Sequence, residues 1–259
     1  MNHEFNATQR PLAGKIALVT GGARGVGQEI SRQLAALGAQ VIITARDKAK
    51  ADMVANILRN QGLQATGLQL DVTSDQDRDA VFSAISEKYG LLDILINNAG
   101  VWLDSANAAT PPERPPSETS ETVVRSTFES NFFAPILLTQ LLLPLLRRSS
   151  AARIVNVSSI RGSLTHLSDA ASPDYPIKAL AYDTSKAALN AFTILLAEEL
   201  RGTSIKVNAI HPGWVRTDMG SEQADLSVEE GAATAIRYAT LDQNGPTGGF
   251  FYQAERLPW

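Results

Sequence analysis

Short apolar runs alternate with helical segments along nearly the whole chain, and this alternation limits the possible folds more than any other feature. The expected strands are residues 16–19, 41–44, 66–70, 93–96, 153–157, 204–209 and 248–253. Strands joined through helices run parallel, because the helix carries the chain back to the edge of the sheet where the previous strand began. The sequence therefore predicts an α/β fold with a single doubly wound parallel β-sheet, helices on both faces, and one domain over residues 12–259.

The N-terminal residues and the most apolar run indicate where in the cell the protein is located. Residues 1–11 are polar and have no apolar core, so we expect a flexible N-terminal tail and not a secretory signal. The run at 132–146 is interrupted by Pro135, Gln140 and Pro144 and is too short to cross a bilayer core of about 30 Å. We therefore expect a cytoplasmic protein that does not interact with membranes.

Composition excludes several classes of site. The formal net charge of −4 argues against nucleic acid as a partner, because a phosphate backbone calls for a basic surface. The chain has no cysteine, which rules out disulfides, thiolate catalysis and Cys-ligated metals. Its three histidines are scattered, so no metal site is expected, and His166 and His211 are interpreted as structural or surface residues.

A glycine-rich turn at residues 20–27 follows the first predicted strand and precedes a helical pattern that stops at Gly38. Strand, glycine turn and helix form the layout of a dinucleotide-binding unit. The glycines let the backbone approach a pyrophosphate, and the helix N-terminus adds free N–H groups and the positive end of its dipole. The spacing of Gly21, Gly25 and Gly27 is not the commoner G-x-G-x-x-G, but its setting still predicts nucleotide binding.

Two arginines indicate which dinucleotide is bound. NAD-specific proteins carry an acidic residue about 20 positions after the glycines, but here the second strand ends in Ala45 and Arg46. Arg24 lies inside the glycine turn as a second cation. Because guanidinium groups bind phosphate in a forked geometry, the pair favours the 2′-phosphate of NADPH. The alternative is that both are solvated surface residues.

Tyr182 and Lys186 lie four positions apart at the start of a predicted helix, residues 182–200, so they share one helix face. A phenol has an unperturbed pKa of about 10, and a neighbouring cation lowers it. The two side chains could therefore act as a proton donor and acceptor. The plainer reading is an aromatic core residue beside a solvated charge.

Polar residues mark the ends of the other strands. Asp71 could accept a bond from an adenine amino group or simply end its strand, and residues 97–100 suit either a crowded cofactor contact or a plain turn. Asn131 lies among three phenylalanines and needs hydrogen-bond partners, from packing or from a site.

The glycine turn, residues 97–100, Ser159, the Tyr182–Lys186 pair and Pro212–Gly213 occur in this order, and together they resemble the short-chain dehydrogenase/reductase superfamily over nearly the whole chain after residue 12. This superfamily has a Rossmann-type fold. Residues 212–219 and 245–250, like Arg46, look most like NADPH-dependent carbonyl reductases.

The resemblance implies a role for each catalytic candidate. Tyr182 would be the general acid that protonates a carbonyl oxygen, or the base in the reverse direction. Lys186 would lower the pKa of Tyr182 and bind the nicotinamide ribose, and Ser159 would polarise the carbonyl. Asn131 would hold a water that connects Lys186 to solvent. The cofactor-binding residues expected from both lines of reasoning are Gly21, Arg24, Gly25, Val26, Gly27, Arg46, Asp71, Val72, Asn98, Ala99, Gly100, Tyr182, Lys186, Pro212, Gly213, Val215 and Thr217.

The sequence thus predicts an NADPH-dependent enzyme that reversibly reduces a ketone or aldehyde. Two alternatives stay open: a cofactor-binding regulatory protein with little turnover, and a reductase of C=C bonds. The pocket walls are expected from loops 101–122, 161–180 and 214–224, where Trp102, Leu164, Trp214 and Met219 suggest an apolar or aromatic small-molecule substrate. The resemblance also implies a possible homodimer or homotetramer.

Overall fold

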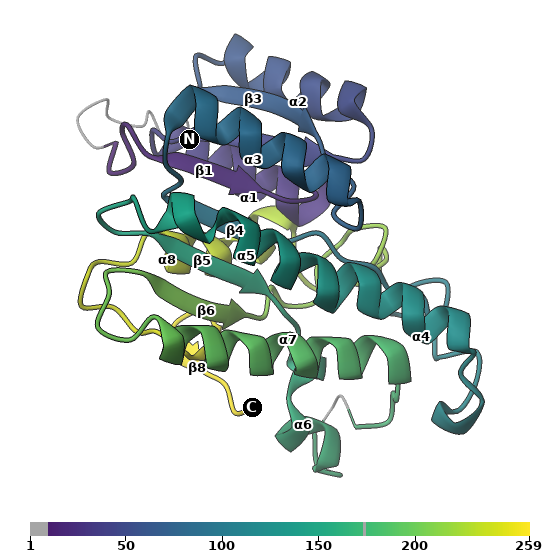
Figure 1. Ribbon diagram of the computed structural model, residues 1–259. Coiled ribbons are helices and arrows are strands. Elements are labelled where there is room, and N and C mark those ends of the chain that lie inside the picture. Colours follow the sequence, from purple (N-terminus) through teal and green to yellow (C-terminus); the bar gives the residue numbers. More distant parts are fainter. Residues whose placement is uncertain (1–9, 173–174) are drawn as a thin grey trace, which may run out of the picture.

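The computed structural model describes residues 10–172 and 175–259, and its centre is one eight-stranded sheet (Figure 1). The strand order is β3-β2-β1-β4-β5-β6-β7-β8, and every pair is parallel except β7 with β8. The strands are β1 (Ile16–Val19), β2 (Gln40–Ala45), β3 (Ala65–Gln69), β4 (Ile94–Asn97), β5 (Arg153–Val157), β6 (Lys206–Ile210), β7 (Phe250–Tyr252) and β8 (Glu255–Arg256). The predicted doubly wound sheet is confirmed, and its order reverses between β1 and β4.

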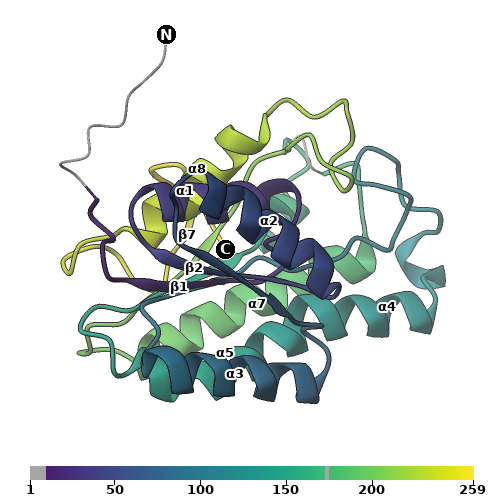
Figure 2. The ribbon, with the colours of Figure 1, turned by 90° about the horizontal axis from the view of Figure 1, so that it is seen from above.

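Helices cover both faces of the sheet (Figure 2). One layer contains α1 (Gly25–Ala36), α2 (Lys48–Asn60) and α8 (Val228–Ala239). The opposite layer contains α3 (Asp75–Tyr89), α5 (Ala134–Leu146) and α7 (Leu180–Glu199). Two separate apolar clusters fill the spaces between these layers and the sheet.

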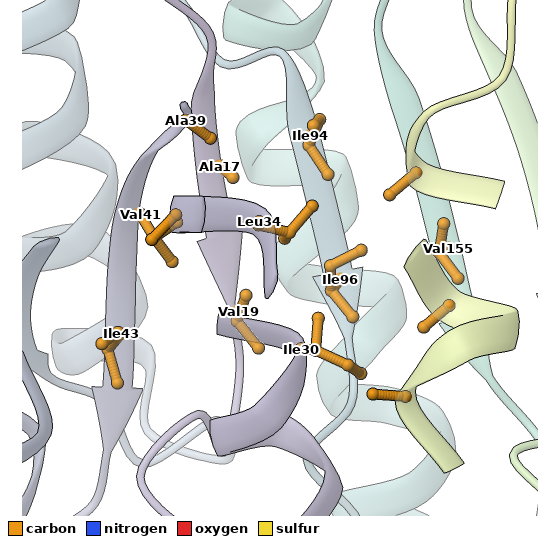
Figure 3. Packing of buried hydrophobic residues seen from close by; sticks show 14 of the residues in the cluster. Ala17, Val19, Ile30, Leu34, Ala39, Val41, Ile43, Ile94, Ile96 and Val155 are labelled. Atoms are coloured by element: carbon orange, nitrogen blue, oxygen red, sulfur yellow. The ribbon is translucent and has the colours of Figure 1, made fainter. Parts of the chain in front are cut away.

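Alternate residues of each central strand belong to the two apolar clusters on opposite faces of the sheet. Ala17 and Val19 of β1 lie in the cluster that contains Ile30 and Leu34 of α1, whereas Leu18 lies in the cluster on the other face (Figure 3). Successive residues of a strand point to opposite faces, so a strand buried on both sides is apolar throughout. The short unbroken apolar runs in the sequence are therefore the central strands of this sheet.

The helical stretch that contains the apolar run 132–146 has three parts. It consists of α4 (Glu121–Phe128), the π-helical turn η2 (Glu129–Phe133) and α5. Pro135 has no N–H group and lies in the first turn of α5, where a wider turn can precede it without loss of a hydrogen bond. Pro144 lies inside α5.

Some elements were not predicted. The loops at 102–122 and 160–180 contain the short helices η1 (Pro116–Glu118), η3 (Ile160–Gly162) and α6 (Leu164–Ser168), and β8 adds a short antiparallel edge. Residues 1–9, which make up most of the predicted tail, lie outside the described residues. Arg10 and Pro11 belong to a turn in which Ala13 N donates to Arg10 O and Leu12 N donates to Leu37 O.

The stretch Glu121–Leu146 is long and apolar enough to cross a membrane by length and composition alone. In this fold, Leu138, Leu142, Leu145 and Leu146 are buried in the cluster that α5 shares with α3, α7 and the sheet. The apolar character of α5 is thus accounted for by core packing.

Replacing Leu142 by alanine is expected to lower the free energy of unfolding by about 2–5 kcal/mol, because a buried leucine leaves a cavity that its neighbours fill only in part. Urea denaturation measures the loss. Met53→Ala on α2 is the control, since 55% of its side chain is exposed, and it should change stability by less than about 0.5 kcal/mol. Equal losses in both variants would contradict the assigned core.

Candidate active site

The predicted site residues gather at the carboxyl ends of the parallel strands, which point to the same side in Figure 1. Thr20 follows β1, Asn98 follows β4, Ser159 lies just beyond β5, and His211 follows β6. In open α/β sheets, ligands bind at this edge where the strand order reverses. Here the reversal lies between β1 and β4, so the glycine turn and residues 98–100 stand at its centre.

The glycine turn is joined to the end of β4 by a dense set of hydrogen bonds. Thr20 Oγ1 accepts the N–H groups of Asn98 and Ala99, each at 2.9 Å, and Asn98 Nδ2 donates to Thr20 O at 2.8 Å. Gly21 and Gly25 have φ values of 62° and 51°, which favour glycine. A side chain at Gly27 would collide with Gly21 O and Asn98 Nδ2.

The N-terminus of α1 is open to an external acceptor. No side chain caps this helix and no acidic residue lies in its first turn, whereas Asp47, Ser74 and Ser227 cap α2, α3 and α8. The first-turn N–H groups and the positive end of the helix dipole suit a phosphate group. The residues present therefore fit the diphosphate of a dinucleotide.

The two arginines expected to bind the 2′-phosphate are exposed, and each already has a neighbour. Arg24 pairs with Asp218 of the loop after β6, with 2.8 Å between Nη1 and Oδ2. Burial raises the pKa of Asp71, but hydrogen bonds from Thr73 and the charge of Arg46 outweigh this and leave the pKa lowered. Asp71 Oδ1 accepts two hydrogen bonds from Thr73, so this carboxylate also forms the turn that ends β3.

The structure brings Ser159, Tyr182 and Lys186 together. Tyr182 and Lys186 lie one turn apart on α7, both buried, with Lys186 Nζ 5.6 Å from the centre of the Tyr182 ring. Lys186 Nζ donates to Val157 O at 2.8 Å. The Ser159 hydroxyl lies close enough to the Tyr182 phenol to lower its pKa.

Burial controls the protonation of this group. It raises the pKa of Tyr182 to about 12 despite the hydrogen bond with Ser159 and the charge of Arg161, and Asp183 adds to the rise. Burial also lowers the pKa of Lys186 to about 8. The expected lowering of the Tyr182 pKa by Lys186 is not observed in the chain alone, because the loss of solvation dominates. A phenol with the ordinary pKa of about 10 is already protonated at neutral pH, and the raised pKa of Tyr182 extends this to higher pH.

Asn131 lies in the π-helical turn η2 and is buried. Its Oδ1 accepts Val101 N at 2.8 Å, and its Nδ2 donates to Val101 O at 2.9 Å and to Ser185 Oγ at 3.1 Å. The side chain thus fastens the loop after β4 to α7. Its predicted function in a water relay stays a prediction.

The short chain dehydrogenase family model matches residues 15–226. This chain belongs to the short-chain dehydrogenase/reductase family. It is 31% identical to carbonyl reductase [NADPH] 1 from Bos taurus, with 94% of this chain and 98% of the relative covered. It is 32% identical to (−)-isopiperitenone reductase from Mentha piperita, with 94% and 98% covered.

Solved structures support the same assignment. Salutaridine reductase from Papaver somniferum has a TM-score of 0.79 at 31% identity, covering 93% of this chain and 100% of the other. An NADPH-bound carbonyl reductase from chicken fatty liver has a TM-score of 0.80 at 28% identity, covering 95% and 99%. The chain is therefore an oxidoreductase of this family, which uses nicotinamide cofactors on small molecules.

Sequence reasoning missed Asp104 in this short-chain dehydrogenase. Its two carboxylate oxygens accept the N–H groups of Ala181 and Tyr182, each at 3.0 Å, so a loop residue caps α7 at Tyr182. The helix has no side-chain cap of its own, since Ala179 occupies the N-cap position. The lack of a capping residue before 180 was the one available signal, and it did not point to Asp104.

The loops expected to wall the pocket of the dehydrogenase contact one another. The ring of Trp102 lies 4.7 Å from that of Tyr182, and both belong to a small cluster completed by Ala179, Ala108 and Met219. Ala108 N donates to Met219 O at 2.8 Å. These loops cover the tyrosine with apolar side chains.

The loop after β6 continues to the glycine turn. Gly213 has a φ of 86°, and a Cβ on Gly25 would lie 3.2 Å from Thr217 Cγ2. Pro212, Gly213, Val215 and Thr217 thus lie on a loop that reaches the glycine turn at Thr217. Leu164 and Trp214, by contrast, are exposed.

His166 and His211 are the two histidines among the described residues of this dehydrogenase. Burial lowers the pKa of His211 to about 4, and its ring centre lies 5.3 Å from that of Tyr252. His166 Nδ1 lies 3.4 Å from Ser172 Oγ. Among residues 10–172 and 175–259, no group of three His, Asp or Glu side chains could hold a metal ion.

Replacing Asp104 by alanine is expected to lower the free energy of unfolding by about 0.5–2 kcal/mol, because two N–H groups of α7 lose their acceptor. Thermal or urea denaturation measures the effect. Asp104→Asn keeps one acceptor oxygen and should recover part of the loss. An alanine variant as stable as wild type would refute the capping role.

Proposed function

We propose that this short-chain dehydrogenase is an NADPH-dependent carbonyl reductase that reversibly converts a ketone or aldehyde into an alcohol. The observation that carries the proposal is the convergence of Ser159, Tyr182 and Lys186 at the carboxyl edge of the sheet. A phenol that carries its proton at neutral pH and lies beside a second hydroxyl can act as the general acid in carbonyl reduction.

The chain's own residues have separate tasks. The Ser159 hydroxyl polarises the carbonyl oxygen, and Tyr182 donates its proton to that oxygen. Lys186, one turn further along α7, contributes positive charge beside the phenol that is losing its proton. The apolar cover from Trp102 and Met219 excludes water from the proton transfer.

The cofactor we propose is NADPH, which supplies the hydride when bound. The glycine turn and the uncapped α1 would hold its diphosphate, and residues 98–100, Lys186 and the loop at 212–217 would line the rest of its site. Arg24 and Arg46 would bind the 2′-phosphate. The NADPH-bound carbonyl reductase among the similar structures supports this choice.

A second candidate reaction is reduction of the C=C bond of an enone. The similarity to (−)-isopiperitenone reductase favours it, since the name of that relative indicates a reductase of an unsaturated ketone. Analysis of the product formed from an enone separates the two reactions, because carbonyl reduction gives an allylic alcohol and C=C reduction a saturated ketone. Failure to oxidise NADPH with any carbonyl would instead favour a regulatory cofactor-binding protein.

We further propose a cytoplasmic enzyme with an apolar or aromatic substrate. Trp102 and Met219 beside Tyr182, and the exposed Leu164 and Trp214 on neighbouring loops, support such a substrate. Exposed apolar side chains on α5 and α7, including Leu137 and Leu195, would suit a homodimer or homotetramer formed through these helices.

Replacing Tyr182 by phenylalanine should lower kcat about 10²- to 10⁴-fold, since the variant has no proton to donate. NADPH binding, measured by fluorescence titration, should stay within about twofold of wild type, because the ring and Lys186 remain. Tyr89→Phe on α3 removes another phenolic hydroxyl and serves as the control. Unchanged turnover in Tyr182→Phe would refute the assignment.

Replacing Arg46 by alanine should raise the KM for NADPH by about 10- to 100-fold, the loss of one charge-assisted hydrogen bond of about 1.5–3 kcal/mol. The KM for NADH should change little, because NADH has no 2′-phosphate. Steady-state kinetics with both cofactors provide the measurement, and Arg147→Ala at the end of α5 is the control. Comparable kcat/KM for NADPH and NADH in the wild-type enzyme would eliminate the proposed preference.

A further inference from the structure

A buried ion pair lies beside the three catalytic candidates. Arg161 Nε donates to Asp183 Oδ1 at 2.8 Å, and Arg161 Nη2 donates to Asp183 Oδ2 at 3.0 Å. The exposed fractions of the two side chains are 9% and 5%. This bidentate ion pair fixes both the distance between Arg161 and Asp183 and their relative orientation.

Each partner belongs to the same short segment as a catalytic candidate. Arg161 lies in η3, and Ser159 is the N-cap residue of η3, with its hydroxyl accepting Arg161 N–H at 3.3 Å. Asp183 directly follows Tyr182, and its Oδ2 also accepts Ala179 N–H at 3.1 Å. The ion pair therefore joins the turn that carries the hydroxyl to the helical turn that carries the phenol.

The chain between these two turns does not provide the connection. After η3 it turns outward through α6, whose Leu164 and Thr165 are exposed, before it returns to α7. On the return, Arg161 Nη2 donates to Ile177 O at 2.6 Å, so the same guanidinium also holds the approach to α7. Because a long stretch of chain separates Ser159 from Tyr182, their relative position depends on noncovalent contacts between η3 and the start of α7.

The guanidinium also supports the aromatic cover of the site. Arg161 Cζ lies 5.6 Å from the Trp102 ring centre, and that ring packs against Tyr182. Arginine is suited to such a position, because its planar group can form a forked ion pair at its edge and contact an aromatic ring with its face.

Stability alone does not account for this pair. Removing two charges from water is unfavourable, and burial raises the pKa of Asp183 to about 6 even with Arg161 beside it. Replacing a buried ion pair by apolar residues of similar volume is often neutral for stability or favourable. A pair retained at this location therefore calls for a role in geometry.

We propose that the Arg161–Asp183 pair is a positioning device that holds the Ser159 hydroxyl within hydrogen-bond reach of the Tyr182 phenol. Neither residue contacts the reacting atoms in this role. The effect on rate rests on the proposed carbonyl reductase activity, whereas the effect on geometry does not depend on it.

The main test is the double variant Arg161→Met with Asp183→Leu, which removes both charges together. Crystal structures of this variant and wild type should show a longer Ser159 Oγ–Tyr182 Oη separation in the variant. For carbonyl reduction, kcat per cofactor-binding site should fall roughly 10- to 100-fold. The Kd for NADPH should stay within about twofold, since the glycine turn is untouched.

A second variant, Arg161→Lys, keeps the charge but cannot reach both oxygens of Asp183 and Ile177 O together. Its kcat should also fall. If the double variant does not fold, this variant tests whether the ion pair positions Ser159. Arg153→Met is the matched control. Arg153 is buried at the opposite end of β5, where it donates to Leu241 O and Ser204 O, so its loss should leave kcat and the Ser159–Tyr182 separation unchanged.

The possible outcomes are separable. An unchanged Ser159 Oγ–Tyr182 Oη separation and unchanged kcat in folded Arg161 variants would overturn the positioning role. If wild type reduces no carbonyl at all, the proposed function fails, and the comparison of crystal structures still decides whether the pair positions Ser159.

Discussion

Burial of the Tyr182 phenol is the constraint on which the rest of the site depends. Loss of water raises the pKa of this phenol to about 12 and lowers that of Lys186 to about 8. The same burial requires every nearby polar group to find a partner within the protein. Ser159 meets the phenol, and the Val157 carbonyl accepts from the ammonium group. Packing thus keeps the Tyr182 phenol protonated up to a higher pH than an exposed tyrosine.

The apolar cover and the polar supports of this tyrosine come from distant parts of the chain. The loop after β4 supplies the ring of Trp102 and the Asp104 carboxylate that caps α7. The segment after β5 supplies Ser159 and Arg161, while the loop after β6 supplies Met219. Parallel strands place all three segments at one edge of the sheet. The fold therefore brings three segments that are far apart in sequence into contact around Tyr182.

The related proteins have similar sequences but different names. Similarity to carbonyl reductase, salutaridine reductase and isopiperitenone reductase extends over most of the chain, yet the names of these relatives indicate different substrates. In this chain, the side chains of Trp102, Ala108 and Met219 pack against Tyr182 from the surrounding loops. We therefore expect these loops to select the substrate.

Sequence alone determined the features that depend on local pattern. Apolar runs predicted the parallel strands, the glycines predicted the turn before α1, and the four-residue spacing placed Tyr182 and Lys186 on one helix face. Tertiary structure decided the Asp104 cap, the Arg161–Asp183 pair, the π-helical turn around Asn131 and the direction of the Tyr182 pKa shift. Periodicity and turn chemistry are set by neighbours in the chain, whereas burial and long-range hydrogen bonds exist only once the strands have assembled.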